Sequence, residues 1–353
     1  MHPIITRYVM GYVFNAILMT LLLILSLDFI GSIVDQSEDL SETYTLYHSL
    51  LIALLELPGE IHEYLPATML IGSLIGLGML STSNEITVMR SAGMSKLHLF
   101  GIACIPVVMV SLAGLLIIEY VVPACHSKLA QVEMDVKGWT SSNPARKWLW
   151  SREGDNFISI REFRGDASIA GLTMFRFDEA GKMSSFLTAA KAQYADTHWA
   201  LENVEVVGLH GDHTEMQRLD SYLWESRLNP QLLEVLTEEP QYLSTTDLWL
   251  NLQYRQSQSL DVAAYEHTFW TRLFQPLVCC ALLLVGISSL FGPMREATMG
   301  YRVFMGVLIG YSFNVVQEML AQLTLAYQLP PILVSIIPIV VVAGVGTHML
   351  RRN

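Results

Sequence analysis

The chain has 353 residues, of which 52% are apolar and only 15% charged, and its formal net charge is −12. This composition is too apolar for a soluble protein of this length, and the negative charge argues against nucleic-acid binding. We therefore expect a membrane protein.

Six apolar segments are long enough to cross a hydrocarbon core of ~30 Å, which takes about 20 helical residues. They are Val9–Val34, Ile61–Thr82, Leu97–Val122, Leu273–Phe291, Tyr301–Tyr327 and Ile332–Leu350. The first is too long for a signal peptide and lacks a small-residue cleavage site after it, so we expect it to remain as a span. The shorter apolar run Leu46–Leu57 predicts a separate interfacial helix before the second span.

The basic residues predict the orientation of these spans. In a six-span arrangement, the basic residues of the short loops and termini all fall on one side of the membrane. They are Arg7, Arg90, Lys96, Arg295, Arg302, Arg351 and Arg352. The loop Asp35–Pro66 contains no Lys or Arg and seven carboxylates. Short cytoplasmic loops carry the excess of Lys and Arg, so both termini are expected in the cytoplasm.

The polar segment Thr82–Lys96, between the second and third spans, predicts a short cytoplasmic helix. Thr82 and Glu85 have the spacing of a capping box, and Gly93 suits a left-handed stop. One side of the helix carries residues at i, i+3, i+4 and i+7, namely Glu85, Val88, Met89 and Ala92. Such a helix, held between two spans, is suited to bind a soluble partner and to pass its movement to the membrane.

About 145 residues, Pro123 to His267, separate the third and fourth spans and are expected on the non-cytoplasmic side. Short strand-like runs separated by turn formers are Lys147–Glu153, Asn156–Phe163, Gly171–Asp178, Ser185–Tyr194, Trp199–Leu209 and Gln217–Glu225. Regularly spaced short strands favour an open sandwich or jelly roll, and the pattern becomes helical after Pro230. The predicted fold is an α-helical six-span domain with an inserted all-β, jelly-roll-like domain. Its parts are residues 1–122 with a polar helix at 83–95, residues 123–267, and residues 268–353.

Motifs for catalysis and metal binding are missing from the sequence. There is no Gly-x-x-x-x-Gly-Lys-Ser/Thr loop, His-Glu-x-x-His, Cys-x-x-Cys or Gly-x-Ser-x-Gly, so no catalytic residue, metal site or bound cofactor is predicted. His210 and His213 flank a predicted hairpin tip and are more simply explained as solvated turn residues than as metal ligands.

Ionisable and polar groups inside spans are costly and indicate function. Asp28 and Glu119 lie near the outer ends of their spans, where water can reach them. The fifth span carries a polar stripe formed by Asn314, Gln317, Glu318 and Gln322. This stripe predicts a cavity or a partner subunit, although Gln317 alone could bind a neighbouring helix. The ridges Gly72-x-x-x-Gly76-x-Gly78 and Gly306-x-x-x-Gly310 predict close helix packing, with a gate at the fifth span as the alternative.

Three segments, in this order, resemble a known family. The first runs from Tyr64-Leu-Pro66 through Leu74-Ile-Gly-Leu-Gly-Met-Leu80 and Asn84-Glu-Ile-Thr-Val-Met89 to Ser91-Ala-Gly93. The second is Glu119-Tyr-Val-Val-Pro123. The third runs from Phe274-Gln-Pro276 through Phe291-Gly-Pro-Met-Arg295 and Met299-Gly300 to Leu329-Pro-Pro331. Together they resemble the LptF/LptG lipopolysaccharide export permeases, within them the LptG type, over essentially the whole length.

The resemblance implies a non-catalytic transmembrane subunit of an ATP-binding-cassette transporter in the inner membrane of Gram-negative bacteria. Its implied partners are the homologous permease LptF, a cytoplasmic LptB dimer that binds ATP and Mg²⁺, the periplasmic bridge proteins LptC and LptA, and lipopolysaccharide itself. Lipopolysaccharide would enter laterally between the first span of one subunit and the fifth span of the other. It would then pass to the periplasmic jelly rolls.

The resemblance also implies site residues. Residues of the coupling helix that fits the ATPase are Glu85, Val88, Met89, Arg90, Ala92 and Gly93, with Glu85 as the partner of an ATPase arginine. Residues of the lipid cavity and gate are Asp28, Phe29, Ile33, Gly306, Gly310, Phe313, Asn314, Gln317 and Glu318. Residues of a periplasmic groove for acyl chains are Phe157, Ile160, Phe175, Phe177 and Phe186.

One departure from the family concerns the outer end of the first span. The stretch Asp28–Leu40 has no Lys or Arg, whereas comparable members carry basic residues suited to lipid phosphates there. Anion contacts would then come from the partner subunit, from bridging divalent cations or from elsewhere. A different reading is a mechanotransmitting subunit that couples ATP hydrolysis to a periplasmic partner without moving lipid through its own spans.

Overall fold

The computed structural model describes residues 3–37, 44–137, 149–154, 156–164, 167–178, 181–195, 197–210, 213–226, 228–258, 260–292, 297–327 and 329–352. The chain forms two compact units. The first comprises Met1–Gly138, Ser244–Thr246 and Ala263–Asn353, and the second comprises Trp139–Leu243 and Asp247–Val262.

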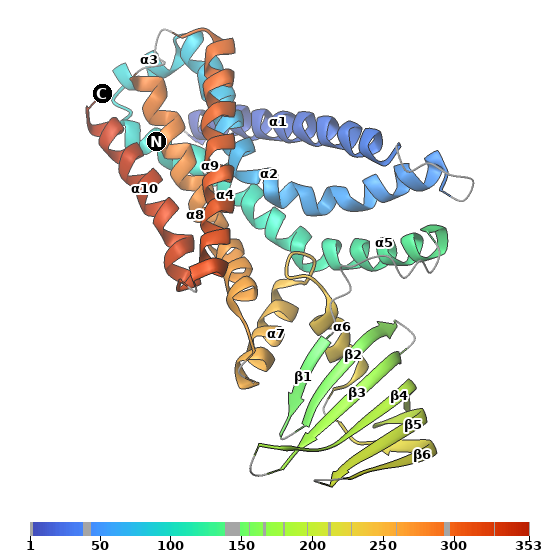
Figure 1. Cartoon of the computed structure of the whole chain (residues 1–353). Coiled ribbons are helices and arrows are strands. Elements are labelled where there is room, and N and C mark those ends of the chain that lie inside the picture. Colours follow the sequence, from blue (N-terminus) through green and yellow to red (C-terminus); the bar gives the residue numbers. More distant parts are fainter. Residues whose placement is uncertain are drawn as a thin grey trace. The chain divides into compact units, whose positions relative to one another are not determined.

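Six helical stretches of the described chain are long and apolar enough to cross a membrane, which confirms the expected number of spans. They are α1 (Pro3–Ser37), α2 (Leu46–Thr82), α4 (Lys96–Leu116) continued by the π-helical turn η1 (Ile117–Val121) and α5 (Val122–Lys137), α8 (Ala263–Phe291), α9 (Met299–Tyr327) and α10 (Pro331–Arg352) (Figure 1).

The separate interfacial helix predicted at Leu46–Leu57 is wrong, because α2 continues without a break from Leu46 to Thr82. Between the short apolar run and the second span the sequence contains no turn signal apart from Pro58 and Gly59. A proline inside a helix removes one hydrogen bond but does not by itself end the helix when tertiary packing holds both sides.

A second proline of α2 is compensated by a side chain from another helix. Pro66 has no N–H, so the carbonyl of His62, four residues earlier, has lost its helical donor. The Nε2 of Gln275, on α8, donates to this carbonyl over 2.6 Å. Inside a membrane such a pairing matters, because water cannot satisfy a free carbonyl there.

The helix α2 is the central element of the membrane unit, and the glycine ridges are packing surfaces. A Cβ on Gly72 would lie 2.6 Å from the Cα of Ile17, so only glycine lets α1 approach this closely. On α9, a Cβ on Gly310 would lie 3.0 Å from the Cβ of Ala67. Thus α1 and α9 both pack on α2 through glycine contacts.

Directly after the C-terminal end of α4, Glu119 lies in η1 and binds the N-terminus of α7 (Thr245–Ser257). The backbone N–H of Thr245 donates to Glu119 Oε2 over 2.9 Å, and the Thr246 hydroxyl donates to Glu119 Oε1. A carboxylate at a helix N-terminus pairs with free N–H groups and favours the helix dipole. Glu119 therefore has a structural partner within the membrane unit.

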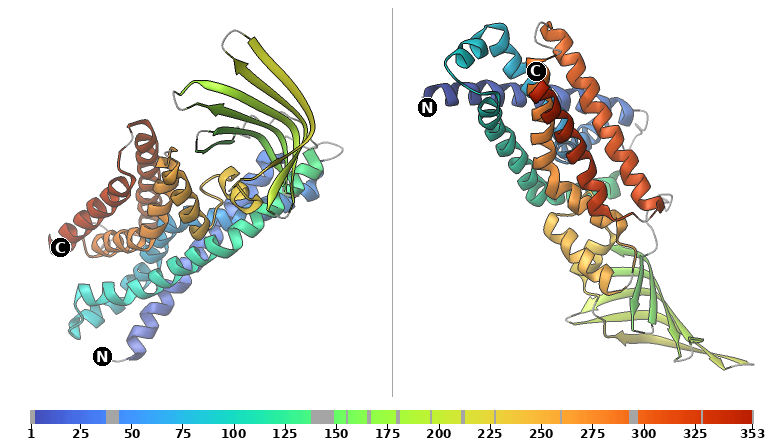
Figure 2. Two further views of the ribbon diagram at one scale, coloured as in Figure 1. Left: turned by 90° about the horizontal axis from the view of Figure 1, so that it is seen from below. Right: turned by 90° about the vertical axis from the view of Figure 1, so that its left-hand side faces the viewer.

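The second unit confirms the inserted all-β domain. Its strands are β1 (Leu149–Glu153), β2 (Asn156–Arg164), β3 (Ser168–Phe177), β4 (Met183–Ala195), β5 (His198–His210) and β6 (His213–Trp224). All neighbours pair antiparallel in chain order, and the sheet is curved (Figure 2). The structure differs from the expected sandwich in one respect: the described strands form a single sheet. Each follows its predecessor through a short turn, and such a meander places neighbours side by side.

One face of this sheet carries the core of the unit. Ile158, Met174 and Leu187 are buried there together with Leu233 and Leu236 of α6 (Pro230–Thr237). The indole of Trp199 donates to the carbonyl of Leu228 over 2.7 Å, which fixes the chain before α6. At the end of α7, Tyr254 shares a hydrogen bond of 2.6 Å with Ser151 of β1, and burial raises the pKa of the Tyr254 phenol.

Candidate functional site

The corner between α2 and α4 contains α3 (Glu85–Ser91), the short helix expected from the polar segment. Gly93 has a φ of +95°, and its N–H donates to the carbonyl of Arg90 over 2.9 Å. The N–H of Met94 reaches the carbonyl of Met89 over 3.1 Å. These bonds satisfy the last carbonyls of α3 and confirm the predicted glycine stop.

The predicted capping box of Thr82 and Glu85 is wrong. Thr82 is the last residue of α2, and its hydroxyl donates to the carbonyl of Gly78 over 2.9 Å. The residue before α3 is Asn84, which has a left-handed φ of 61° and makes no side-chain cap. Glu85 instead accepts a hydrogen bond of 2.9 Å from the hydroxyl of Ser83. Thr82 belongs to the last turn of α2, so its hydroxyl binds a carbonyl of α2 instead of capping α3.

One side of α3 is anchored and the other is available to a partner. Ile86 is 5% exposed and belongs to the apolar core of the membrane unit, with Met89 partly buried against it. Val88 is 66% exposed, and Ala92 is exposed as well. The predicted docking residues Val88, Arg90, Ala92 and Gly93 are therefore exposed and Glu85 is half-buried, whereas Met89 contributes to anchoring. The sequence alone did not distinguish Ile86, whose role depends on the neighbouring spans.

Side chains from other helices hold the same corner. The guanidinium of Arg90 lies 5.1 Å from the ring centre of Phe291, the last residue of α8, and the ammonium of Lys96 lies 5.5 Å from it. A cation over the face of an aromatic ring is attracted by the quadrupole of the ring. From α9, Arg302 Nη1 donates to the carbonyl of Gly78 over 2.9 Å.

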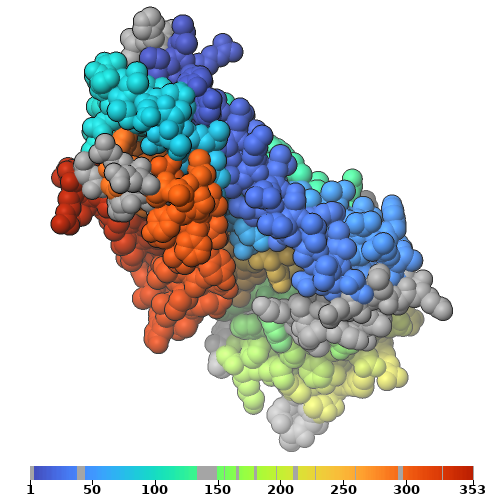
Figure 3. Space-filling model, turned by 90° about the horizontal axis from the view of Figure 1, so that it is seen from above, coloured from blue at the N-terminus to red at the C-terminus, as the bar shows by residue number. Residues whose placement is uncertain are grey.

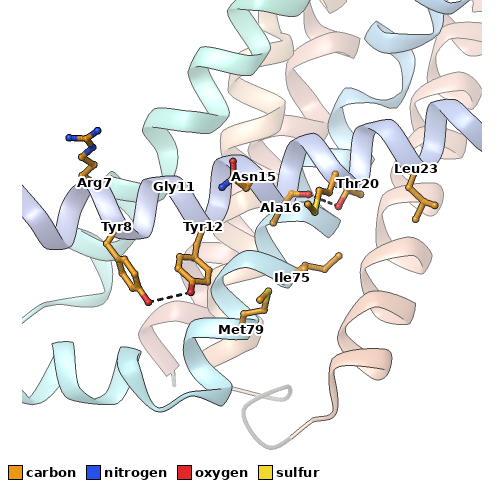
Figure 4. Close-up of a pocket in the computed structure, with 11 residues that line it drawn as sticks. Arg7, Tyr8, Gly11, Tyr12, Asn15, Ala16, Thr20, Leu23, Ile75 and Met79 are labelled. Carbon is orange, nitrogen blue, oxygen red and sulfur yellow. Dashed lines mark hydrogen bonds between the residues drawn. The ribbon is translucent and has the colours of Figure 1, made fainter.

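An open pocket of about 590 Å³ lies between α1 and the C-terminal half of α2. Figure 4 shows Tyr8 and Tyr12 of α1 on the same side as Ile75 and Met79 of α2, with the two tyrosine hydroxyls hydrogen-bonded over 3.3 Å. The lining is largely apolar. Much of α1 (dark blue in Figure 3) lies at the surface, where Met19 is 73% exposed. This surface can contact lipid or another membrane protein.

The C-terminal end of α1 and the N-terminal half of α2 bring acidic groups together. Tyr64 donates to Asp28 over 2.7 Å, and Ser32 donates to Glu56 over 3.1 Å. Glu63 is close enough to both Asp28 and Glu318 of α9 for their charges to interact. The predicted cavity residues Asp28, Phe29 and Ile33 are all partly exposed at this end.

The predicted gate residues of α9 separate into two groups. Gly306, Gly310 and Phe313 pack toward α2, and Phe313 is only 7% exposed. Asn314 and Gln317 are half-buried, and Glu318 is exposed. A helix periodicity of 3.6 residues places Gln317 on the same side as Gly310 and Phe313, one turn farther along, and places Asn314 and Glu318 on the adjacent side. All three polar residues are less buried than Phe313.

In the β unit, four of the predicted groove residues share one sheet face. Phe157 pairs with Phe175, and Phe175 pairs with Phe186 across neighbouring strands. The rings of Phe157 and Phe177 lie 5.3 Å apart between their centres. Ile160 lies on the other face, where it is 2% exposed in the core. Its placement follows from strand alternation, since Phe157 and Ile160 are an odd number of positions apart.

Within the parts of the chain that the structure describes, no group of three or more His, Cys, Asp or Glu is arranged to hold a metal ion. His210 and His213 pair across the β5–β6 turn, as expected of a hairpin, and Gly211 and Asp212 lie outside the described residues. Residues 293–296, which include Arg295 of the family resemblance, also lie outside them.

The helices and the insert together define a class: a multi-pass α-helical membrane protein that carries a β domain between its third and fourth spans. The short helix α3 between its second and third spans is exposed on one side and anchored on the other.

The chain belongs to the lipopolysaccharide export system permease LptF/LptG family, whose model matches residues 7–352. It is 29% identical over 346 residues to the lipopolysaccharide export system permease protein LptG of Escherichia coli K12, covering 95% of this chain and 94% of that protein. It is 27% identical over 336 residues to the LptG protein of Haemophilus influenzae, covering 94% of each. These relatives make the chain an LptG-type permease.

Proposed function

We propose that the chain is the permease half of an ATP-binding-cassette transporter that extracts lipopolysaccharide from the inner membrane. A separate cytoplasmic ATPase, an LptB dimer, would supply the energy, and LptF would form the other half. The β domain would pass the lipid to LptC and onward to LptA in the periplasm. Both termini and α3 would face the cytoplasm, in accordance with the distribution of basic residues.

The observation that carries this proposal is the construction of α3. Ile86 and Met89 join it to the membrane core, so a force on α3 reaches the spans. Val88 and Ala92 are exposed and available to an ATPase groove, and Glu85 is half-buried. An exposed helix without such anchoring would bind a partner but would transmit little of its movement.

The outer end of the proposed cavity is acidic. Phosphates of a lipid head group would be repelled by Asp28, Glu56 and Glu63 unless cations lie between them. Those cations would come from the partner permease or from bridging divalent ions. The apolar surface of α1 and the half-buried Gln317 of α9 would contact the acyl part and the edge of the cavity.

Photo-crosslinking residues placed at Phe29 and Gln317 test lipid extraction against a purely mechanical role. We expect lipopolysaccharide adducts at both positions, and we expect them to depend on the ATPase and ATP. A crosslinker at the buried Phe313 is the matched control and should give few adducts. If the assembled complex gives no adducts at Phe29 or Gln317, lipid does not pass these spans and the mechanotransmitting function is correct.

Glu85→Lys tests the docking of α3. The substitution reverses the charge that faces the proposed ATPase arginine, so transport should fall by about tenfold or more while ATP hydrolysis continues. Lipopolysaccharide release per ATP in proteoliposomes measures this coupling. Thr87→Lys adds the same side chain at an exposed neighbouring position and should have a smaller effect. Normal export by the Glu85→Lys complex would show that α3 does not dock through this carboxylate.

A further inference from the structure

Two basic side chains from different helices are held against one aromatic ring at the end of the membrane unit that carries α3. Arg90 belongs to the last turn of α3, and Lys96 is the first residue of α4. Their charged groups lie 5.1 Å and 5.5 Å from the ring centre of Phe291. The ring attracts both cations, whereas the cations repel each other. An anion bound beside the ring would relieve that repulsion.

Both cations are available to a ligand. Arg90 is exposed and Lys96 is half-buried. Among the residues that the structure describes, neither forms an ion pair with a carboxylate. The formal net charge of the whole chain is −12, so this positive region stands out against a negative protein. Its charge is complementary to an anionic group such as a phosphate.

The end of α10 adds positive charge to the same region. Its last two residues, Arg351 and Arg352, are both exposed. The hydroxyl of Ser288, one turn before the end of α8, donates to the carbonyl of Gly346 on α10 over 2.8 Å. This bond fixes the end of α10 next to the end of α8, where Phe291 lies. Figures 1 and 2 show the ends of these helices on the side of α3.

An apolar stripe begins directly after the cation pair and runs along α4. Leu97, Ile105 and Met109 are 68%, 43% and 57% exposed, and a Cβ on Gly101 would have no neighbour within 4 Å. These positions are spaced by multiples of four, so they share one side of the helix. A molecule with an anionic head and apolar tails matches both features. A water-soluble phosphate would leave the stripe unused.

The cation pair lies away from the side of α3 that is proposed to bind the ATPase. Arg90 is two positions from Val88, which is about 200° around a helix. It is one turn after Ile86, on the side that is anchored in the membrane core. A protein on the Val88 side and a lipid at Arg90 can therefore be bound together.

We propose that Arg90, Lys96 and Phe291 form a binding site for the phosphate of an acidic phospholipid, whose tails lie along the α4 stripe. Arginine binds phosphate oxygens through paired N–H groups, and lysine binds them as a compact charge. In the orientation proposed above this lipid belongs to the cytoplasmic leaflet, so the inference rests on the proposed function. It adds a lipid that is bound and not transported, and that connects α3, α4 and α8.

Photolabelling of the complete transporter in lipid vesicles tests this site. The probe is phosphatidylglycerol with a photoactivatable group in its acyl chain, and the comparison is phosphatidylethanolamine with the same group, which has no net charge. Adducts on the α4 segment Leu97–Met109 are quantified by mass spectrometry after digestion. We expect more adducts from phosphatidylglycerol than from phosphatidylethanolamine.

Three variants separate a built site from a general attraction to positive charge. Lys96→Gln should lower the phosphatidylglycerol adducts about fivefold. Phe291→Leu changes no charge but releases both cations, so it should lower them about two- to fivefold. If Phe291→Leu does not assemble, Arg90→Gln takes its place. Lys128→Gln, at an exposed position of α5, is the matched control and should leave the adducts unchanged.

Equal labelling by the two lipids, or full labelling of Phe291→Leu or of its replacement, overturns the inference. Labelling that disappears when the ATPase is bound also overturns it, because the cations then contact the ATPase. Export of lipopolysaccharide is measured in the same vesicles. Normal export without a preference for phosphatidylglycerol overturns the lipid site alone, whereas preferential labelling without export leaves the site and overturns the proposed function.

Discussion

At the scale of single residues, partners that are far apart in sequence replace bonds that local structure loses. Pro66 removes the donor for the His62 carbonyl, and Gln275, more than 200 positions later, provides another. Glycine residues allow helices to pack closely. At Gly72 and Gly310 a larger residue would displace the neighbouring helix. These residues matter because lipid offers no hydrogen bonds and no room for a displaced helix.

Gln275→Leu should destabilise the chain by about 1–3 kcal/mol, because the His62 carbonyl is then buried without a donor. Thermal unfolding in detergent measures the loss, with Gln131→Leu at an exposed position of α5 as the control. In a Pro66→Ala background the backbone N–H of residue 66 is restored, so Gln275→Leu should cost clearly less there. Equal losses in both backgrounds would show that Gln275 acts through packing instead.

At the scale of elements, contacts between α4 and α8 connect the two halves of the membrane unit on either side of the insert. The thiols of Cys104 on α4 and Cys280 on α8 lie 3.3 Å apart, although 176 residues separate them in sequence. The sequence assigned both residues to spans but could not pair them. Their contact gives a direct measurement of how α4 and α8 pack.

Mild oxidation with copper phenanthroline should link Cys104 to Cys280 in the purified complex. The linked peptides are identified by mass spectrometry after digestion. Cys104→Ser should abolish the product, and Cys125→Ser should leave it unchanged. A lasting absence of the link in the unsubstituted chain would mean that α4 and α8 are packed differently.

At the scale of the whole molecule, the β sheet has one face closed by its own helix and another lined with aromatic rings. The closed face holds Ile160 in the core. The aromatic face carries Phe157, Phe175, Phe177 and Phe186, of which Phe157 is 38% exposed. A lipid passing over this unit would contact the aromatic face.

Crosslinkers at Phe175 and Phe186 should therefore capture lipopolysaccharide through its acyl chains during transport, and one at Ile160 should not. Adducts are mapped by mass spectrometry after mild acid release of the sugar. Capture at Ile160 in place of Phe175 would mean that the sheet opens on its packed side.

Sequence patterns were enough to assign the class of this protein. Hydrocarbon thickness sets the length of a span, so runs such as Leu273–Phe291 predicted the membrane helices, and the motifs from Tyr64 to Pro331 indicated the family. Turn residues such as Gly181 and the glycine stop at Gly93 were also readable, since positive φ values favour glycine. Tertiary structure alone decided that α2 is one helix, that Phe313 and Ile160 are buried, and that Arg302 binds the Gly78 carbonyl. These features depend on which distant helix or strand packs against each residue. A local sequence pattern does not indicate that neighbour.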